Sequence, residues 1–131
     1  MRALAFLALI IAGLSLGGCG AMRTLQQDVK SLFGSTKGEP ALAVGIRQYE
    51  DGKYPEAAES LNTALYRGLS SADRVKAHKY LAFVHCISSR PSACREQFRR
   101  ALALDPNLEL SAAEAGHPIW GPVFRAVKAG R

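Results

Sequence analysis

The chain has 131 residues and a formal net charge of +6, from 17 lysines and arginines against 11 aspartates and glutamates. Its length allows one domain with a single modest core. The basic residues are spread along the chain without a block of five like charges, so the pattern argues against a nucleic-acid partner.

Residues 1–18 have the pattern of a secretory signal peptide. Arg2 supplies the positive start, and Ala3–Leu16 is an apolar run that only Gly13 and Ser15 interrupt. Small residues follow, as they do before a cleavage site. The run is shorter than the roughly twenty residues that a membrane-spanning helix needs. We therefore exclude residues 1–18 from the predicted fold.

The string Leu16-Gly17-Gly18-Cys19 resembles a bacterial lipobox. In that motif the cysteine thiol is acylated and the cysteine becomes the new N-terminus. The resemblance implies that Cys19 is lipidated, with palmitate among the attached chains. Gly20 after the cysteine fits sorting to the outer membrane, facing the periplasm, a rule that belongs to the same resemblance. The alternative is an ordinary signal peptide or membrane helix that happens to contain Cys19.

Residues 19–39 are predicted to form a lipidated tether. Ser35–Pro40 has the composition of a loop. The apolar residues before it are close to helical spacing: Met22, Leu25, Val29, Leu32 and Phe33. They fit a short amphipathic helix, on the membrane or on the domain, and equally a linker without fixed structure.

Residues 40–131 are predicted to form one helical domain. Apolar residues recur at helical spacing over 41–50, 55–67, the stretch from Ser70 to about Ser88, and 91–104. Prolines stand where helices begin, Gly68 stands where one ends, and Ser70 with Asp73 resembles a capping box. No segment alternates as a half-buried strand does. The fold class predicted from the sequence is all-α.

The helix pairs repeat at an offset of 37 residues, since Ala43-Val44-Gly45 to Ala64-Leu65 aligns with Leu81-Ala82 to Ala101-Leu102. In an antiparallel hairpin, the sequence positions of two residues that face each other add up to a nearly constant sum. This register predicts that small residues face large ones at matching places, which lets the helices approach closely. The facing pairs are Gly45 with Leu61, Tyr49 with Ala57, Ala82 with Phe98, and Cys86 with Cys94.

This pattern resembles the tetratricopeptide repeat family over roughly residues 41–107. The resemblance implies two helical hairpins. The shared features are the small residues Gly45 and Ala82 in the first helices, the turn Gly52-Lys53-Tyr54, the series Ala57, Leu61, Ala64, Leu65, and the ending Ala101–Pro106. The chain departs from the family at Cys94, where alanine is usual, and at the turn Ser88–Pro91, which lacks glycine. Its offset exceeds the family's repeat of about 34 residues, which places an insertion at 68–72. The alternative is a generic four-helix unit.

Residues 108–131 are predicted to cap the second hairpin, because two repeats alone rarely bury a continuous core. Ser111–Glu114 reads as a capping box. Trp120 and Phe124 are four residues apart and are expected to cover the exposed face of the helix at 91–104. The alternative makes Trp120 an anchor for a partner.

The ending Glu114–Phe124, the two later cysteines and the lipobox together resemble the small lipoproteins associated with type VI secretion systems, the TssQ-type family. This resemblance implies a place in a secretion gene set. The alternative is a lipoprotein of general cell-envelope assembly or maintenance.

No catalytic motif is found in the sequence, so we expect no enzyme, no cofactor and no small-molecule substrate. His85 beside Cys86 lacks further ligands at metal-site spacing, so we expect no metal. Cys86 and Cys94 face each other in the register, and an oxidising compartment permits a disulfide between them. The alternative is two buried thiols.

The repeat resemblance also implies a groove lined mainly by the first helices, in which another protein binds. It points to Arg47, Gln48, Lys79 and Tyr80 as partner-binding residues, with Trp120 as the further candidate. The expected partner is a component of the secretion apparatus, and the expected membrane contact is the lipid anchor.

Overall fold

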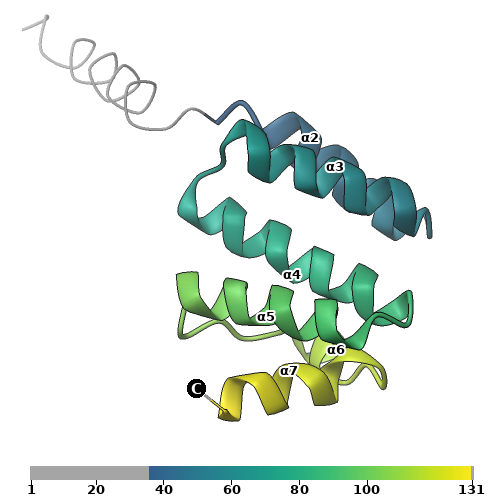
Figure 1. Ribbon diagram of the computed structural model, residues 1–131, viewed down its shortest axis with the longest axis vertical. Coiled ribbons are helices and arrows are strands. Elements are labelled where there is room, and N and C mark those ends of the chain that lie inside the picture. Colours follow the sequence, from purple (N-terminus) through teal and green to yellow (C-terminus); the bar gives the residue numbers. More distant parts are fainter. Residues whose placement is uncertain (1–35, 131) are drawn as a thin grey trace, which may run out of the picture. The chain divides into compact units, whose positions relative to one another are not determined.

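The computed structural model describes residues 36–130 (Figure 1). The predicted signal peptide, Cys19, Gly20 and almost all of the tether lie outside the described residues. Residues 36–130 form six helices and contain no strand, which confirms the all-α class for this part of the chain. None of these helices has the length and apolar character needed to cross a membrane.

The first four helices agree with the sequence prediction to within about two residues at each end. Their bounds are α2 (Glu39–Glu50), α3 (Tyr54–Arg67), α4 (Ser71–Ile87) and α5 (Pro91–Leu104); α6 (Ala112–Ala115) and α7 (Trp120–Ala129) follow. The packed structure starts earlier than the predicted boundary at residue 40. Gly38 is buried, and its N–H donates a hydrogen bond to the carbonyl oxygen of Gly68 at 3.0 Å.

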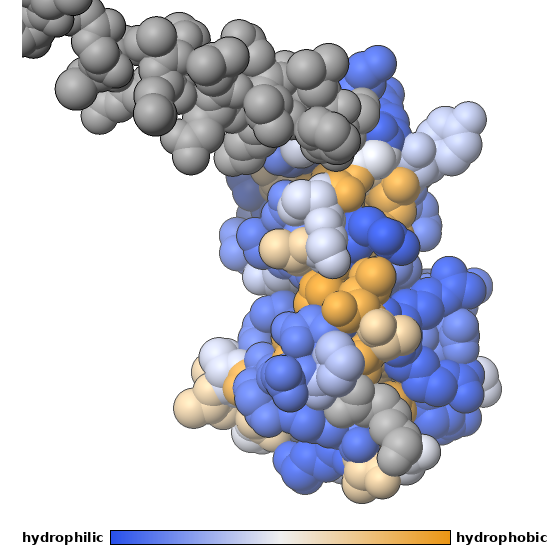
Figure 2. Space-filling view, turned by 90° about the vertical axis from the view of Figure 1, so that its left-hand side faces the viewer, coloured by the Kyte–Doolittle hydropathy of each residue, from blue (hydrophilic) through white to orange (hydrophobic). Residues whose placement is uncertain are grey.

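The helices form two antiparallel hairpins, α2–α3 and α4–α5, joined by the packing of α3 on α4 (Figure 1). α7 covers the side of α5, and the end of α4, that would otherwise face solvent. On the face shown in Figure 2, hydrophobic residues gather in a band between the two hairpins, while hydrophilic residues dominate above and below it. The two hairpins therefore share one apolar contact layer.

The structure confirms the predicted register at two points. A Cβ atom built on Gly45 would lie only 2.8 Å from Cγ of Leu61, so the two residues face each other and the glycine lets the helices approach. Cys86 and Cys94 form a disulfide with their Cα atoms 5.1 Å apart. That separation is within the usual range for a disulfide. The free-thiol alternative does not describe this structure.

The two hairpin turns are built alike, 37 residues apart. Gly52 has φ of +75°, and Ser89, its counterpart, has φ of +57°. Both are in the left-handed region, which glycine adopts without strain and serine does not. The flanking hydrogen bonds match: Gly52 N–H to Tyr49 O (3.0 Å) with Ser89 N–H to Cys86 O (3.2 Å), and Lys53 N–H to Gln48 O (2.8 Å) with Arg90 N–H to His85 O (2.9 Å).

Aromatic stacking holds the C-terminal cap on the second hairpin. The Trp120 ring stacks on Phe83 with centroids 4.6 Å apart, and Phe124 meets Phe98 edge-on at 5.2 Å. Trp120 is 5% exposed and Phe124 is 4% exposed. The predicted covering of the helix at 91–104 is confirmed for Phe124, whereas the Trp120 ring stacks on Phe83 of α4. The helix that carries them, α7, runs to Ala129, well beyond the aromatic pair.

Candidate partner-binding surface

Three tyrosines meet where α2, α3 and α4 come together at the turn end of the first hairpin. Tyr49 of α2 lies 6.0 Å from Tyr54 of α3 and 5.2 Å from Tyr80 of α4, measured between ring centroids. All three side chains are half-buried, so part of each is open to solvent. We call Tyr49, Tyr54 and Tyr80 the tyrosine cluster. Rigid, amphipathic rings of this kind are enriched where proteins bind one another.

The hydroxyl groups of Tyr49 and Tyr80 stay protonated at neutral pH. Burial raises the pKa of Tyr49 to about 12, and the neighbouring Tyr54, Tyr80, Glu114 and Glu50 add to the effect. Burial also raises the pKa of Tyr80, with Glu114 and Glu50 contributing. Each of these two hydroxyl groups can therefore donate as well as accept a hydrogen bond, with Glu50 and Glu114 nearby.

Arg47 and Gln48 precede the cluster on α2. The Arg47 side chain is exposed. Gln48 is half-buried, and its Oε1 atom is buried without a hydrogen-bond partner among the described residues. The counterpart of Gln48 in the second hairpin is His85, whose Nδ1 atom is also buried without a partner there. Burial, with Arg90 as a lesser cause, lowers the pKa of His85.

The chain itself engages Lys79. Its ammonium lies 2.7 Å from a carboxylate oxygen of Glu114 in α6, and the two side chains are only 18% and 22% exposed. The same ammonium lies 5.3 Å above the Tyr80 ring and 5.7 Å above the Phe83 ring. Burial acts to raise the pKa of Glu114, but its bonds with Lys79 and Ser111 outweigh burial, so the pKa is lowered. Lys79 thus supports the cap in this structure rather than presenting a free cation to a partner.

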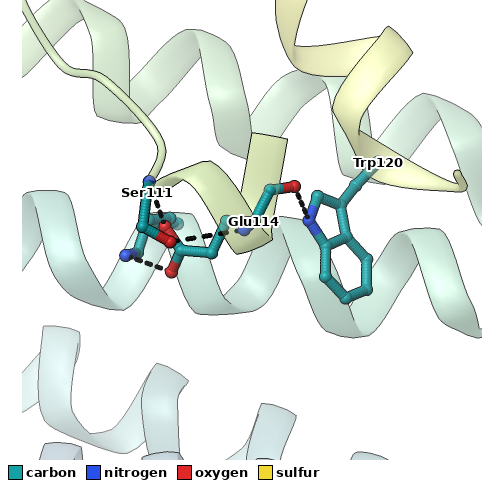
Figure 3. A network of polar contacts seen from close by, with 4 residues as sticks. Ser111, Glu114 and Trp120 are labelled. Carbon is teal, nitrogen blue, oxygen red and sulfur yellow. Dashed lines mark hydrogen bonds and ion pairs between the residues drawn. The ribbon is translucent and has the colours of Figure 1, made fainter. Parts of the chain in front are cut away.

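Figure 3 shows how Glu114 ties α6 to the core. Ser111 and Glu114 form a capping box, in which the Ser111 hydroxyl accepts from the Glu114 N–H and the Glu114 carboxylate accepts from the Ser111 N–H. The indole Nε1–H of Trp120 donates to the backbone carbonyl of Glu114 at 2.9 Å. Trp120 is therefore a core residue here, and it offers a partner almost no surface.

The segment that links α5 to α7, residues 105–119, runs against the same side of α4 as Lys79. We call it the strap. Leu108 of the strap closes an open hollow of about 180 Å³ together with Ala72, Val75, Lys76 and Lys79 of α4. Leu110 is buried in the core that α4, α5 and α7 share. The chain therefore already covers part of this face of the second hairpin.

The predicted site residues are only partly brought together. Lys79 and Tyr80 are adjacent, Arg47 and Gln48 lie on the neighbouring helix, and Trp120 lies apart in the core. Sequence reasoning missed Tyr49 and Tyr54 as site residues, although both flank the Gly52 turn and so had to meet. It also missed Glu114 as the partner of Lys79.

Within residues 36–130 no three His, Cys, Asp or Glu side chains are grouped so that they could hold a metal ion. Comparison with protein-family models, with curated proteins and with solved structures found no match.

Proposed function

We propose that the protein is a lipid-anchored adaptor on the periplasmic side of the outer membrane, and that it holds another protein against the tyrosine cluster and α2. The observation that carries the proposal is the half-buried tyrosine cluster, with the exposed Arg47 two positions before Tyr49 on α2. It offers aromatic surface, hydroxyl groups and a cation, which are the groups that dominate binding energy at protein interfaces.

The matching turns support a further assignment of the two hairpins as tetratricopeptide-like repeats, with residues 108–131 as their cap. Stacked repeats of this kind serve as scaffolds that present one extended surface to a partner. In this chain the strap covers part of α4, so the partner surface we propose consists mainly of α2 and the tyrosine cluster. This differs from a groove shared equally by both first helices.

The lipobox resemblance supports the anchor, and acylation by more than one chain gives stable membrane attachment. Cys19→Ser is expected to leave the precursor uncleaved and without palmitate. Metabolic labelling with palmitate measures this directly. Normal labelling of the Cys19→Ser variant would remove the basis for the anchor.

The resemblance of the C-terminal ending to type VI secretion lipoproteins suggests a secretion component as the partner. A photo-crosslinking amino acid at position 47 of the full-length protein, expressed in its own cells, tests the surface. The matched control carries the same group at position 99, on the exposed side of α5. We expect a single adduct from position 47 that is absent from position 99 and is lost in a Tyr80→Ala background.

Equal adducts from positions 47 and 99, or an adduct that survives Tyr80→Ala, would contradict the proposed surface. The identity of the adduct decides the biological setting. A secretion component supports the secretion role, whereas an envelope-assembly protein supports the general maintenance role.

A further inference from the structure

We propose that the open end of the first hairpin is a membrane-contacting face, which rests on an anionic phospholipid surface through Tyr66, Arg67 and Lys37. This inference builds on the proposed lipid anchor. It adds a second, non-covalent attachment of the folded domain itself to the bilayer.

Tyr66 is the first observation. It lies in the last turn of α3 and is 93% exposed, whereas the three tyrosines of the cluster are half-buried. An aromatic ring held in water gains nothing from packing. At a bilayer surface the same ring occupies the headgroup level, where tyrosine is enriched because one end is apolar and the other polar.

The charges beside Tyr66 are the second observation. Arg67 and Lys37 are both exposed, and neither forms an ion pair with another residue of the range 36–130. An unpaired basic side chain close to an anionic membrane contributes about 1 kcal/mol of attraction. The two cations are complementary to phosphate headgroups.

A hollow with a mixed apolar and polar lining adjoins Arg67. It has a volume of about 320 Å³ and lies between α2 and α3, with Pro40, Ala41 and Val44 on one side and Thr63 and Arg67 on the other. Glu59 and Ser60 complete its lining. Val44 is 37% exposed, one of few large apolar side chains in the described range that is open to solvent. The side of the hollow formed by α2 offers apolar surface near Arg67, while Glu59 leaves one acidic group in the lining.

The third observation is that the first described residues, which follow the predicted tether, lie at the open end of the first hairpin. The hydrogen bond from Gly38 N–H to Gly68 O fixes the first described residues beside the last turn of α3. Thr36 follows Cys19 by seventeen positions. Even fully extended, such a length spans at most about 60 Å. An anchor at Cys19 therefore keeps the Tyr66 end within that distance of the bilayer.

The tyrosine cluster belongs to the opposite end of the same hairpin, since Tyr49 and Tyr54 flank the Gly52 turn and Tyr66 follows Tyr54 by twelve residues. Twelve residues of helix span about 18 Å. In the proposed arrangement the hairpin contacts the membrane at one end and binds its protein partner at the other.

The test uses the chain from Cys19 onward, coupled through the Cys19 thiol to a maleimide-bearing phospholipid in vesicles of phosphatidylethanolamine and phosphatidylglycerol. The sequence has three cysteines, and Cys86 and Cys94 are paired, so Cys19 is the thiol that reacts. This coupling tests the face whether or not cells acylate Cys19, so its result is separate from that of the palmitate experiment.

The readout is quenching of tryptophan fluorescence by brominated lipid. Trp120 is the only tryptophan and is buried, so it supplies a low background. Tyr66→Trp is compared with Ala103→Trp, a matched control at an exposed position of α5. We expect at least twice as much quenching for Tyr66→Trp, and a loss of that excess when Lys37→Glu and Arg67→Glu are added. Helical circular dichroism checks that each variant is folded.

Equal quenching of Tyr66→Trp and Ala103→Trp would overturn the proposal, as would an excess that the two charge reversals leave unchanged. A second copy of the chain could bind this face in place of a membrane. Sedimentation without vesicles tests it, because a dimer that Tyr66→Ala abolishes would assign the face to self-association and overturn the membrane assignment.

Discussion

The two hairpins share one turn geometry and are stabilised in different ways. The first places glycine wherever the backbone demands it, at Gly45 for the close approach of the helices and at Gly52 for the left-handed turn. The second carries Ser89 in the same turn conformation and adds a disulfide. One supersecondary unit can thus be held either by residues that fit its backbone or by a covalent link that compensates for a poorer fit.

The neighbours of the two hairpins differ as well. The second hairpin packs against α3 on one side and α7 on the other, whereas the first packs only against α4 within residues 36–130. We infer that the second hairpin and its cap are the most stable part of the domain.

Core truncation should cost most in the second hairpin. Phe98 and Leu61 are both fully buried, and Phe98 contacts the rings of both Phe83 and Phe124. Phe98→Ala is expected to lower the free energy of unfolding by about 3–5 kcal/mol and Leu61→Ala by about 2–5 kcal/mol. Urea unfolding followed by circular dichroism measures both. Losses below about 1 kcal/mol at either site would show that the packing is described wrongly.

Removal of the disulfide should lower the stability of the second hairpin toward that of the first. Cys86 and Cys94 are separated by eight positions, and closing so short a loop contributes roughly 2–3 kcal/mol in the chain-entropy model. The double variant Cys86→Ala, Cys94→Ala should lose about this amount and stay helical. Hydrogen exchange locates the change, which we expect in α4 and α5. Faster exchange confined to α2 and α3 would contradict the comparison.

The two turns offer a reciprocal exchange of residues. Gly52→Ala should lower the free energy of unfolding by about 1 kcal/mol, because alanine is strained at this φ while nothing crowds the site. Ser89→Gly should raise it by up to about 1 kcal/mol, because it removes the corresponding strain. Thermal melts of the two variants against the parent provide the measurement. Changes of the same sign in both would refute the equivalence of the turns.

Acid should weaken the second hairpin first, because it carries His78 and His85 and the first hairpin has no histidine. Burial lowers the pKa of both histidines. At His78 the hydrogen bond with Gln97 acts to raise the pKa, whereas the charges of Arg100 and Arg74 lower it further. The unfolded chain therefore binds more protons, so stability is full above about pH 6.5 and declines as the pH falls below that value. Urea unfolding at pH 7.5 and 5.5 measures the decline, which His78→Gln with His85→Gln should flatten. Equal stability of the unsubstituted protein at the two pH values would contradict this prediction.

Most of the fold could be predicted from the sequence because the sequence signals for it are local. Prolines mark the starts of α2, α3 and α5, and the cap formed by Ser70 marks the start of α4. The constant sum of facing positions places Leu61 opposite Gly45 and pairs Cys86 with Cys94. Each of these signals lies within a single hairpin. Antiparallel geometry needs only the position of the turn to set the register.

The candidate site was less accessible, because its decisive contacts join residues far apart in the chain. Lys79 and Glu114 are 35 residues apart, and no periodicity relates them. Lys79 was therefore expected to bind a partner protein, whereas in the structure its charge is paired with Glu114 of the strap. Similarly, the sequence left Trp120 with two possible roles. The hydrogen bond to Glu114 and the stack on Phe83 make it part of the core.

The position of Trp120 gives the domain its own optical probe. It is the only tryptophan, its indole stacks on Phe83, and the His117 ring lies parallel to it at 3.3 Å between centroids. Undocking of the cap would expose the indole to water and shift its emission to longer wavelength, while the helices of the first hairpin stayed formed. Fluorescence and circular dichroism would then follow different transitions, and their separation along a denaturation curve would measure how far the cap and the first hairpin unfold independently.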